Sequence, residues 1–338
     1  MENVKWIDFG GNKLKSKKKI IKIIISVFLI VVLFGALGAS YLIGNLVFEG
    51  STQLVTNEST ATVSSSFWQA YYIDYEKFKS DYKIEKIELK SSLDEHIIPG
   101  DYMYSKNNKD KNKDTVILVH GLGGNRLNTY PIAQIFLNQG YNVVAYDQRS
   151  SGENTAKYTT FGYLESEDLK DYINYVKEEN KDNKLVVWGT SFGGATVGIA
   201  LGDEKVNEVV DNVILDCPVS NMEYMIKVQL EIMNIGIPTN YLLYTGNMVN
   251  KMKLGFGYSD ADVTRYTSKT TVPILIFNSK IDEVTPYFMG EDIYNSIPHN
   301  NKKLVTVDDS EHANISLNHR EEYENEILNF ISGNLVYN

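Results

Sequence analysis

The segment Gly189–Gly193 has the composition of a turn that presents a reactive serine. Its sequence is GTSFG, and it lies between two apolar stretches, KLVVW at 184–188 and the run 193–201. Two glycines permit the sharp bend between a strand and a helix that projects the Ser191 hydroxyl above a sheet, and the Phe192 N–H would then face a developing oxyanion. We therefore expect Ser191 to be a nucleophile; the alternative is a glycine-rich turn with a structural serine.

A serine hydroxyl is a weak nucleophile, so this hypothesis requires a base and an acid that orients the base. Of the five histidines, His312 follows an apolar run through a short polar segment, which puts it in a loop at the carboxyl edge of a predicted strand. Asp282 follows another predicted strand in the same way, with Glu283 as a rival acid. His319 is the substitute for His312, and a surface-loop histidine is the alternative interpretation.

The turn His120–Arg126 (HGLGGNR) follows an apolar run and supplies a second oxyanion donor, for which the N–H of Leu122 is the candidate. It lacks the Gly-Lys-Ser/Thr ending of a phosphate-binding loop and the G-x-G-x-x-G spacing of a dinucleotide fold. The single cysteine, Cys217, has no neighbouring Cys or His at ligand spacing, so neither a disulfide nor a structural zinc is expected. We expect the chemistry to need no metal and no cofactor.

Short apolar runs alternate with amphipathic segments, which is typical of parallel strands joined by crossover helices. We expect an α/β fold with a mostly parallel central sheet flanked by helices, and the site at the carboxyl ends of its strands. The expected strands are 84–89, 97–104, 115–119, 141–146, 184–188, 213–216, 272–277 and 303–307. The expected helices are 128–138, 165–179, 193–201 and 320–331.

Residues 219–267 interrupt this alternation and include five methionines. We interpret them as a helical lid, since flexible apolar side chains can cover a site and accept acyl chains of different shapes. The alternative is that the segment packs onto the domain without a role in ligand binding. Elsewhere, Asp147 and Arg149 follow a predicted strand, and we expect them to form an ion pair that braces the neighbouring loops. Binding of a substrate carboxylate by Arg149 is the alternative.

The amino-terminal part of the chain predicts a membrane anchor. Residues 1–22 carry a local charge of +5, which leaves −15 for the rest of a 338-residue chain whose net charge is −10. The 26 residues from Ile23 to Phe48 are uncharged and exceed the roughly 20 that span a bilayer. The lysines favour a cytoplasmic amino end, so the remainder would lie outside the membrane. A cleaved signal peptide is the alternative, but the apolar run is longer than a signal peptide needs.

The division that follows is a cytoplasmic basic segment at 1–22, a transmembrane helix at 23–48, a tether at 49–66 and a large domain at 67–338. The Ser/Thr-rich stretch 51–66 predicts a solvated tether. Aromatic residues at helical spacing over 67–82 predict a helix packed on the domain, or alternatively one lying on the lipid surface. The acidic net charge disfavours a nucleic-acid partner.

From Thr115 to Phe330 the chain resembles serine hydrolases with the α/β-hydrolase fold. The resemblance is carried by HGLGGNR, by YDQRSSGEN at 146–154 and by GTSFGG at 189–194, and it extends to bacterial surface-anchored hydrolases. That branch is similar in layout to monoacylglycerol lipases and to serine aminopeptidase-like and acyl-thioesterase-like hydrolases. The resemblance implies a catalytic site whose members are the nucleophile Ser191, the acid Asp282, the base His312, and the oxyanion-hole N–H groups of Leu122 and Phe192.

We therefore expect a membrane-anchored, extracytoplasmic serine hydrolase that cleaves an ester, thioester or amide through an acyl-serine intermediate. Its substrate would be a small acyl ester, a lipid or a short peptide, and the membrane would be contacted through Ile23 to Phe48. A peptidase would need a carboxylate for the peptide amino terminus, and Glu153 or Glu223 could serve. An acyltransferase, or a non-catalytic surface receptor on a hydrolase scaffold, would be compatible with the same residues.

Overall fold

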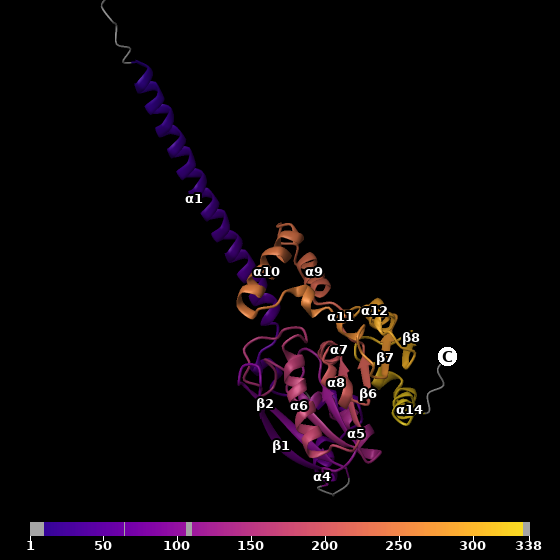
Figure 1. Cartoon of the computed structure of the whole chain (residues 1–338). Helices are drawn as coiled ribbons and strands as arrows, with labels where there is room; N and C mark the ends of the chain where they lie inside the picture. The colour runs from indigo at the N-terminus through magenta and orange to yellow at the C-terminus, as the bar shows by residue number, and fades with distance from the viewer. Residues whose placement is uncertain (1–9, 64, 106–109, 334–338) are drawn as a thin grey trace, which may run out of the picture.

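Figure 1 shows the computed structural model of the chain, which describes residues 10–63, 65–105 and 110–333. Residues 1–9 of the predicted cytoplasmic segment and residues 106–109 of a lysine- and asparagine-rich loop lie outside this part. A twisted sheet flanked by helices forms the body of the molecule, and one long helix extends from it (Figure 1).

The sheet has eight strands in the order β1-β2-β4-β3-β5-β6-β7-β8. Strand β2 pairs antiparallel with β1 and with β4, and all other pairs are parallel, so the predicted fold class is confirmed. The bounds are β1 Lys83–Lys90, β2 Ile97–Tyr104, β3 Thr115–Val119, β4 Asn142–Tyr146, β5 Leu185–Thr190, β6 Asn212–Asp216, β7 Ile274–Ser279 and β8 Lys302–Val307.

Helices cover both faces of this sheet. One face packs on α6 (Glu165–Glu179), α7 (Phe192–Ala200), α8 (Glu204–Val209) and α12 (Phe288–Ser296). The other packs on α5 (Tyr130–Asn138), α13 (Ile315–Asn318) and α14 (Arg320–Ile331), and α5 is preceded by a 3-10 turn, η1 (Arg126–Thr129). Every residue of β3, β4 and β7 is buried, which explains their nearly continuous apolar sequences.

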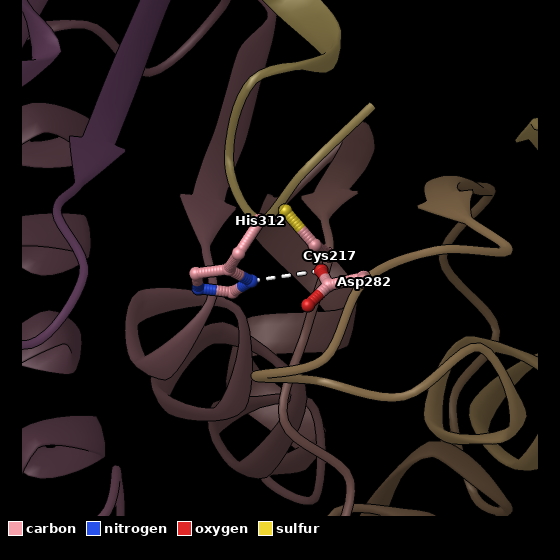
Figure 2. A group of neighbouring side chains, drawn as sticks. All are labelled: Cys217, Asp282 and His312. Atoms are coloured by element: carbon pink, nitrogen blue, oxygen red, sulfur yellow. Dashed lines mark hydrogen bonds and ion pairs between the residues drawn. The ribbon is translucent and has the colours of Figure 1, made fainter. Parts of the chain in front are cut away.

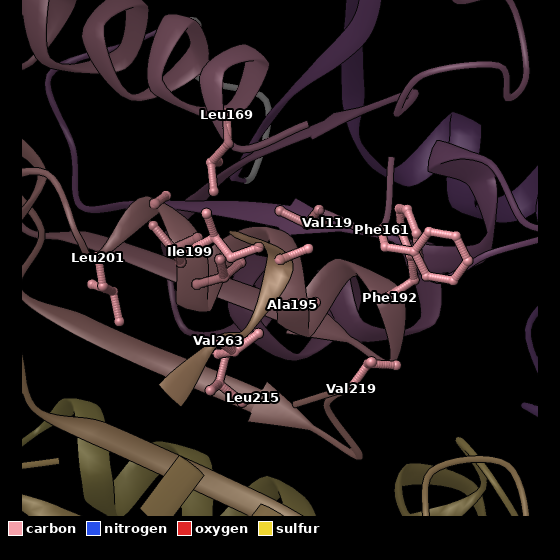
Figure 3. Packing of buried hydrophobic residues seen from close by; sticks show 14 of the residues in the cluster. Val119, Phe161, Leu169, Phe192, Ala195, Ile199, Leu201, Leu215, Val219 and Val263 are labelled. Carbon is pink, nitrogen blue, oxygen red and sulfur yellow. The ribbon is translucent and has the colours of Figure 1, made fainter. Parts of the chain in front are cut away.

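Figure 3 shows the core on the α6 and α7 side, where Val119 of β3 and Leu215 of β6 lie among the side chains of Leu169 and Ala195. Helix α7 begins directly after β5, an inner strand of the sheet, so the serine turn at its amino end lies at the carboxyl end of that strand. The sheet and this helix together fix the position of the candidate site.

The long helix α1 runs from Gly10 to Thr52 and contains the predicted transmembrane segment. It is long and apolar enough to cross a membrane, and its most apolar 18-residue window has a mean hydropathy of 3.0 and no burial against the rest of the chain. Its carboxyl-terminal turns, in contrast, pack on the domain, because Phe48 and Thr52 are buried. The helix and the domain therefore join without an intervening flexible segment.

The stretch predicted to be a solvated tether is partly folded onto the domain. It contains a short helix, α2 (Asn57–Thr60), whose Asn57 amide donates to the carbonyls of Gly152 and Asn154. Thr60 is buried and accepts a hydrogen bond from the Gly152 N–H. The polar side chains that predict solvation in the sequence instead cap α2 and bind it to the loop after β4.

The aromatic segment that follows forms two helices, α3 (Ser65–Ala70) and α4 (Tyr75–Asp81), with a break at Tyr72, where φ is +56°. Trp68 and Phe78 are buried, and their rings lie 5.6 and 5.0 Å from that of Tyr130 in α5. The aromatic side chains therefore pack on the domain, where they form part of its core.

The predicted lid segment contains α9 (Met222–Met233), α10 (Thr239–Leu254), a 3-10 turn, η2 (Tyr258–Ala261), and α11 (Thr264–Thr267). Helices α9 and α10 form a pair that extends away from the sheet, and α10 lies beside the carboxyl-terminal part of α1 (Figure 1). The segment is helical, as expected, but its outer half projects toward α1.

Candidate active site

Ser191 occupies the turn between β5 and α7 in a strained backbone conformation, with φ +53° and ψ −117°. A Cβ on Gly193 would lie 2.3 Å from the carbonyl oxygen of Val119, and one on Gly189 would lie 2.5 Å from that of Gly193. Both glycines are therefore required by close backbone approach. The strain is retained because the surrounding strands and helix fix the turn, and this is a feature of functional sites.

Ser191, His312 and Asp282 form one hydrogen-bonded chain. Nε2 of His312 lies 2.9 Å from Oγ of Ser191, and Nδ1 of His312 lies 2.8 Å from Oδ2 of Asp282. The three residues follow β5, β8 and β7, so they meet at the carboxyl edge of the parallel sheet as the sequence predicts. With Nδ1 donating to the carboxylate, Nε2 is free to accept the serine proton.

The carboxylate of Asp282 is fixed by several donors. The N–H groups of Val284 and Thr285 donate to its Oδ1 at 2.9 and 2.8 Å, and the Thr285 hydroxyl donates to its Oδ2 at 2.9 Å. Burial alone would raise the pKa of Asp282, but the hydrogen bond and charge of His312 outweigh it and hold the pKa below its ordinary value. Sequence reasoning did not identify Thr285, although its spacing from Asp282 suits a side-chain turn.

The rival residues lie elsewhere. Glu283 is exposed, and it is Asp282 that contacts the imidazole. His319 lies on the surface, where its Nε2 is 2.6 Å from Oδ1 of Asp309. The structure therefore brings together the preferred acid and base.

The turn after β3 lies beside the serine. A Cβ on Gly121 would be 3.3 Å from the Cβ of Ser191, and Gly123 has φ +81°, a conformation that favours glycine. Leu122 lies between these glycines with its side chain 40% exposed. Phe192 is the first residue of α7, where backbone N–H groups have no partner within the helix.

His120 is buried and braces this turn. Its Nε2 accepts from the Gln148 N–H at 2.9 Å, which leaves the proton on Nδ1, 2.7 Å from the carbonyl of Gly121. Burial lowers the pKa of His120, so the imidazole is neutral and suited to this donor–acceptor role. This supporting role could not be read from the sequence, because Gln148 lies 28 residues away on another loop.

The predicted ion pair between Asp147 and Arg149 is wrong. Asp147 pairs instead with Arg126, and Arg149 pairs with Asp94 and Asp168 at 2.9 and 3.0 Å. Each side chain finds a partner on a different element, Asp147 at the start of η1 and Arg149 in the β1–β2 turn and α6. Both pairs still brace loops, and the buried, paired guanidinium of Arg149 is not available for a substrate carboxylate.

Cys217, Asp282 and His312 place a sulfur, an oxygen and a nitrogen within 4.8 Å of one another, a spacing that a metal ion could use (Figure 2). Burial raises the pKa of the Cys217 thiol well above its ordinary value, whereas metal binding requires the thiolate. Figure 2 also shows that the imidazole and the carboxylate already bind each other. We therefore interpret Asp282 and His312 as a hydrogen-bonded pair, and Cys217 as a buried neighbour of that pair.

Behind Cys217, Asp216 ends strand β6 in a buried polar chain. It accepts hydrogen bonds from the Tyr323 hydroxyl at 3.0 Å and from the Cys217 thiol at 3.3 Å, and Tyr323 accepts from the Trp188 indole at 2.8 Å. Burial raises the pKa of Asp216 to about 6. Sequence reasoning assigned no role to this carboxyl group.

Comparison with known proteins agrees with the fold. Residues 114–235 match the family described as alpha/beta hydrolase fold. The uncharacterized protein YqkD of Bacillus subtilis is 26% identical over 64% of this chain and 71% of its own length. The lysophosphatidylserine lipase ABHD12 of Xenopus tropicalis is 22% identical over 53% of this chain and 46% of its own length.

Among solved structures, an esterase of Pyrococcus furiosus superposes with a TM-score of 0.61 and 19% identity, over 82% of this chain and 97% of that esterase. The chain therefore has the α/β-hydrolase fold, and its relatives support a hydrolase.

Proposed function

From the α/β-hydrolase fold of this chain, we propose that it is a membrane-anchored serine hydrolase that cleaves acyl esters at Ser191. The observation that carries the proposal is the hydrogen-bonded chain from Ser191 through His312 to Asp282, with distances of 2.9 and 2.8 Å. The strained serine turn supports it, because a serine at φ +53° and ψ −117° persists only where the surrounding structure fixes it, as at functional sites.

In the proposed reaction, Oγ of Ser191 attacks the ester carbonyl carbon while Nε2 of His312 accepts the hydroxyl proton. The N–H groups of Leu122 and Phe192 stabilise the oxyanion of the tetrahedral intermediate, each contributing about 3–4 kcal/mol. The imidazolium then gives its proton to the leaving alcohol as the C–O bond breaks. Water repeats the sequence on the acyl-serine, and the acid product and free serine result.

Asp282 holds the imidazole in the required tautomer and stabilises its charged form. The donors around its carboxylate keep it ionised, since each of them binds the charged form better than the neutral one. Thr285 is a positioning residue in this scheme, because it contacts both Asp282 and His312.

The anchor in this proposal is α1. Its uncharged run from Ile23 to Phe48 follows a cluster of lysines, which favours a cytoplasmic amino end and an extracytoplasmic catalytic domain. Because the last turns of α1 pack on the domain, we propose that the helix remains attached to the mature protein.

One contact and the side chains around the triad support esters over peptides as substrates. The carboxylate of Glu153, a candidate partner for a peptide amino terminus, lies 2.6 Å from Nη2 of Arg126 and is already paired, whereas Glu223, the other candidate, is exposed on α9. Apolar side chains lie partly exposed around the triad, among them Leu122 and Val284. The names of the P. furiosus esterase and of the lysophosphatidylserine lipase support the same substrate class.

Labelling of the detergent-extracted full chain with a fluorophosphonate tests the proposal. We expect Ser191→Ala to abolish labelling, and His312→Ala and Asp282→Asn to slow it by about 10³- to 10⁴-fold, since removal of either group leaves the serine unactivated. Glu283→Gln and His319→Ala are matched controls that should label like the wild type. Labelling that persists in Ser191→Ala would refute the assignment of the nucleophile.

A substrate panel then tests the ester class. We expect p-nitrophenyl esters of graded chain length to be hydrolysed in a Ser191-dependent manner, and aminoacyl anilides to be hydrolysed far more slowly. Faster cleavage of the anilides would favour a peptidase. Labelling without hydrolysis of either would point to another acyl acceptor.

A further inference from the structure

The turn between α9 and α10 exposes a cluster of large apolar side chains. Ile232, Met233 and Ile235 are 71, 64 and 53% exposed. They belong to a stretch of 19 residues, from Ile232 to Asn250, that contains no charged residue. Exposed apolar clusters of this kind mark contact with a protein, a ligand or a membrane.

The position of this turn relative to α1 follows from the contacts between α10 and α1. The Tyr241 hydroxyl lies 2.6 Å from Oγ of Ser40, and the Lys253 ammonium lies 2.5 Å from Oδ1 of Asn45. Residue numbers therefore increase in the same direction along α10 and along the end of α1, beside which α10 lies (Figure 1). The turn precedes Tyr241, so it lies on the amino-terminal side of Ser40 along α1.

The length of the membrane segment gives the depth of Ser40, and hence of the turn, in the bilayer. At about 1.5 Å per residue, the roughly 20 residues that cross a hydrocarbon core of about 30 Å, counted from Ile23, end near Leu42. Ser40 lies in the last turn before that point. The apolar tip of the helical pair is therefore level with the outer boundary of the hydrocarbon core.

The charged residues of the pair agree with this depth. Lys251 and Lys253 are at the carboxyl end of α10, away from the turn. On α9, Lys227 and Glu231 precede the uncharged stretch. Charges thus begin where the polar headgroups would begin, and aromatic residues such as the exposed Tyr244 suit the interface.

We infer that the tip of the α9–α10 pair, formed by Ile232, Met233 and Ile235, inserts into the outer leaflet beside α1 and binds lipid acyl chains. The inference rests on the proposed membrane anchor, and it extends the proposed function by naming the source of the substrate. The partner is the lipid leaflet, because Tyr41 and Leu42 of α1, which directly follow the Ser40–Tyr241 contact in the sequence, are also exposed.

The same pair of helices leads to the nucleophile. Helix α9 begins shortly after Val219, whose N–H donates to the carbonyl of Ser191 at 3.2 Å. Near the start of α9, the rings of Tyr224 and Phe288 lie 5.1 Å apart and are partly exposed. The pair therefore connects the leaflet with the serine turn, and acyl esters held in the membrane are its substrate class.

A site-specific fluorescent probe tests insertion directly. Because Cys217 is buried, Ile235→Cys can be labelled with an environment-sensitive nitrobenzoxadiazole dye in the full chain reconstituted into phosphatidylcholine vesicles, with unmodified protein as the blank. Asp182→Cys, exposed in the loop before β5 at the opposite edge of the sheet, is the matched control. We expect blue-shifted emission and quenching by acyl-chain-brominated lipids at position 235, and neither at position 182.

Two outcomes would overturn the inference. Emission at 235 equal to that at 182 would show that the tip lies in water. A blue shift without quenching by brominated lipid, dependent on protein density in the vesicle, would show that a second copy of the chain covers the cluster.

A functional comparison separates this inference from the proposed function. In the triple variant Ile232→Ser, Met233→Ser, Ile235→Ser, we expect fluorophosphonate labelling of Ser191 and hydrolysis of a short soluble ester to match the wild type, which also shows that the variant folds. Hydrolysis of a long-chain monoacylglycerol in vesicles should fall about tenfold or more, because each serine reduces the apolar area that the tip buries in the leaflet. Equal loss on both substrates, or no loss on vesicles, would contradict it. A failure of the proposed function would appear instead as absent labelling in the wild type, while the probe measurement would still report insertion.

Discussion

Asp216 is an uncommon buried carboxyl group, because its partners are a tyrosine, a thiol and no cation within hydrogen-bonding distance among the contacts described for it. Burial raises its pKa from 3.8 to about 6. A carboxyl group whose pKa is higher in the folded protein binds a proton on folding between the two values. Its contribution to stability is therefore most favourable below about pH 4 and is lost as the pH rises through about 6.

This sign leads to a pH prediction. We expect wild type to lose up to about 3 kcal/mol of stability from this group between about pH 4 and pH 7, and Asp216→Asn to lack that loss. Thermal unfolding of the detergent-solubilised proteins at pH 4 and pH 7 measures it. If the stability of the two proteins depended on pH in the same way, the pKa of this carboxyl group would not be raised by burial.

At the level of single residues, the sequence is informative where chemistry requires a fixed spacing. Ser191, Asp282 and His312 were predictable because each follows an apolar strand at the edge where parallel strands end. The supporting groups were not predictable. Thr285 and His120 act through hydrogen bonds to residues whose proximity depends on the three-dimensional arrangement of separate loops.

At the level of elements, the turn from β5 to α7 depends on how closely α7 approaches β3. A Cβ at position 193 would lie 2.3 and 2.6 Å from the carbonyl oxygens of Val119 and His120, which are backbone atoms and cannot rotate away. We expect Gly193→Ala to destabilise the protein by about 1–3 kcal/mol and to reduce fluorophosphonate labelling, since the strand and the serine turn must separate.

Gly50→Ala is the matched control, because a Cβ there meets no atom within 4 Å. Thermal unfolding and labelling rates of both variants provide the measurement. Equal behaviour of the two variants would show that the turn tolerates a side chain and that its glycines are not needed for close approach.

The elements themselves were predictable to different degrees. Buried strands such as β3 were predicted with correct bounds, because a strand covered on both faces has an uninterrupted apolar sequence. The stretch around α2, which packs on the domain, could not be predicted, because Ser, Thr and Asn suit a solvated tether and a capped short helix equally well. The stretch folds as a capped helix because it forms hydrogen bonds with Gly152 and Asn154 in the loop after β4.

At the level of the whole molecule, α1 and the domain form one packed unit. A Cβ on Gly44 would lie 2.4 Å from the backbone oxygen of Thr245 in α10, whereas one on Gly38 meets no atom within 4 Å. We expect Gly44→Ile to separate α1 from α10 and to lower stability by about 1–3 kcal/mol, with Gly38→Ile unchanged. Thermal unfolding in detergent compares the two, and a similar midpoint for both would argue that the helix is attached only through the chain.

The arrival of α1 at the carboxyl edge of the sheet has a kinetic consequence. Thr52, at its end, accepts a hydrogen bond from Thr159 in the region between β4 and α6, and the Ser191 turn lies at the same edge. If the function proposed above holds, a hydrolase anchored through α1 would meet a lipid substrate by lateral diffusion in two dimensions. Its rate would follow the mole fraction of ester among the surrounding lipids, so that adding inert lipid slows turnover even when the total amount of ester is constant.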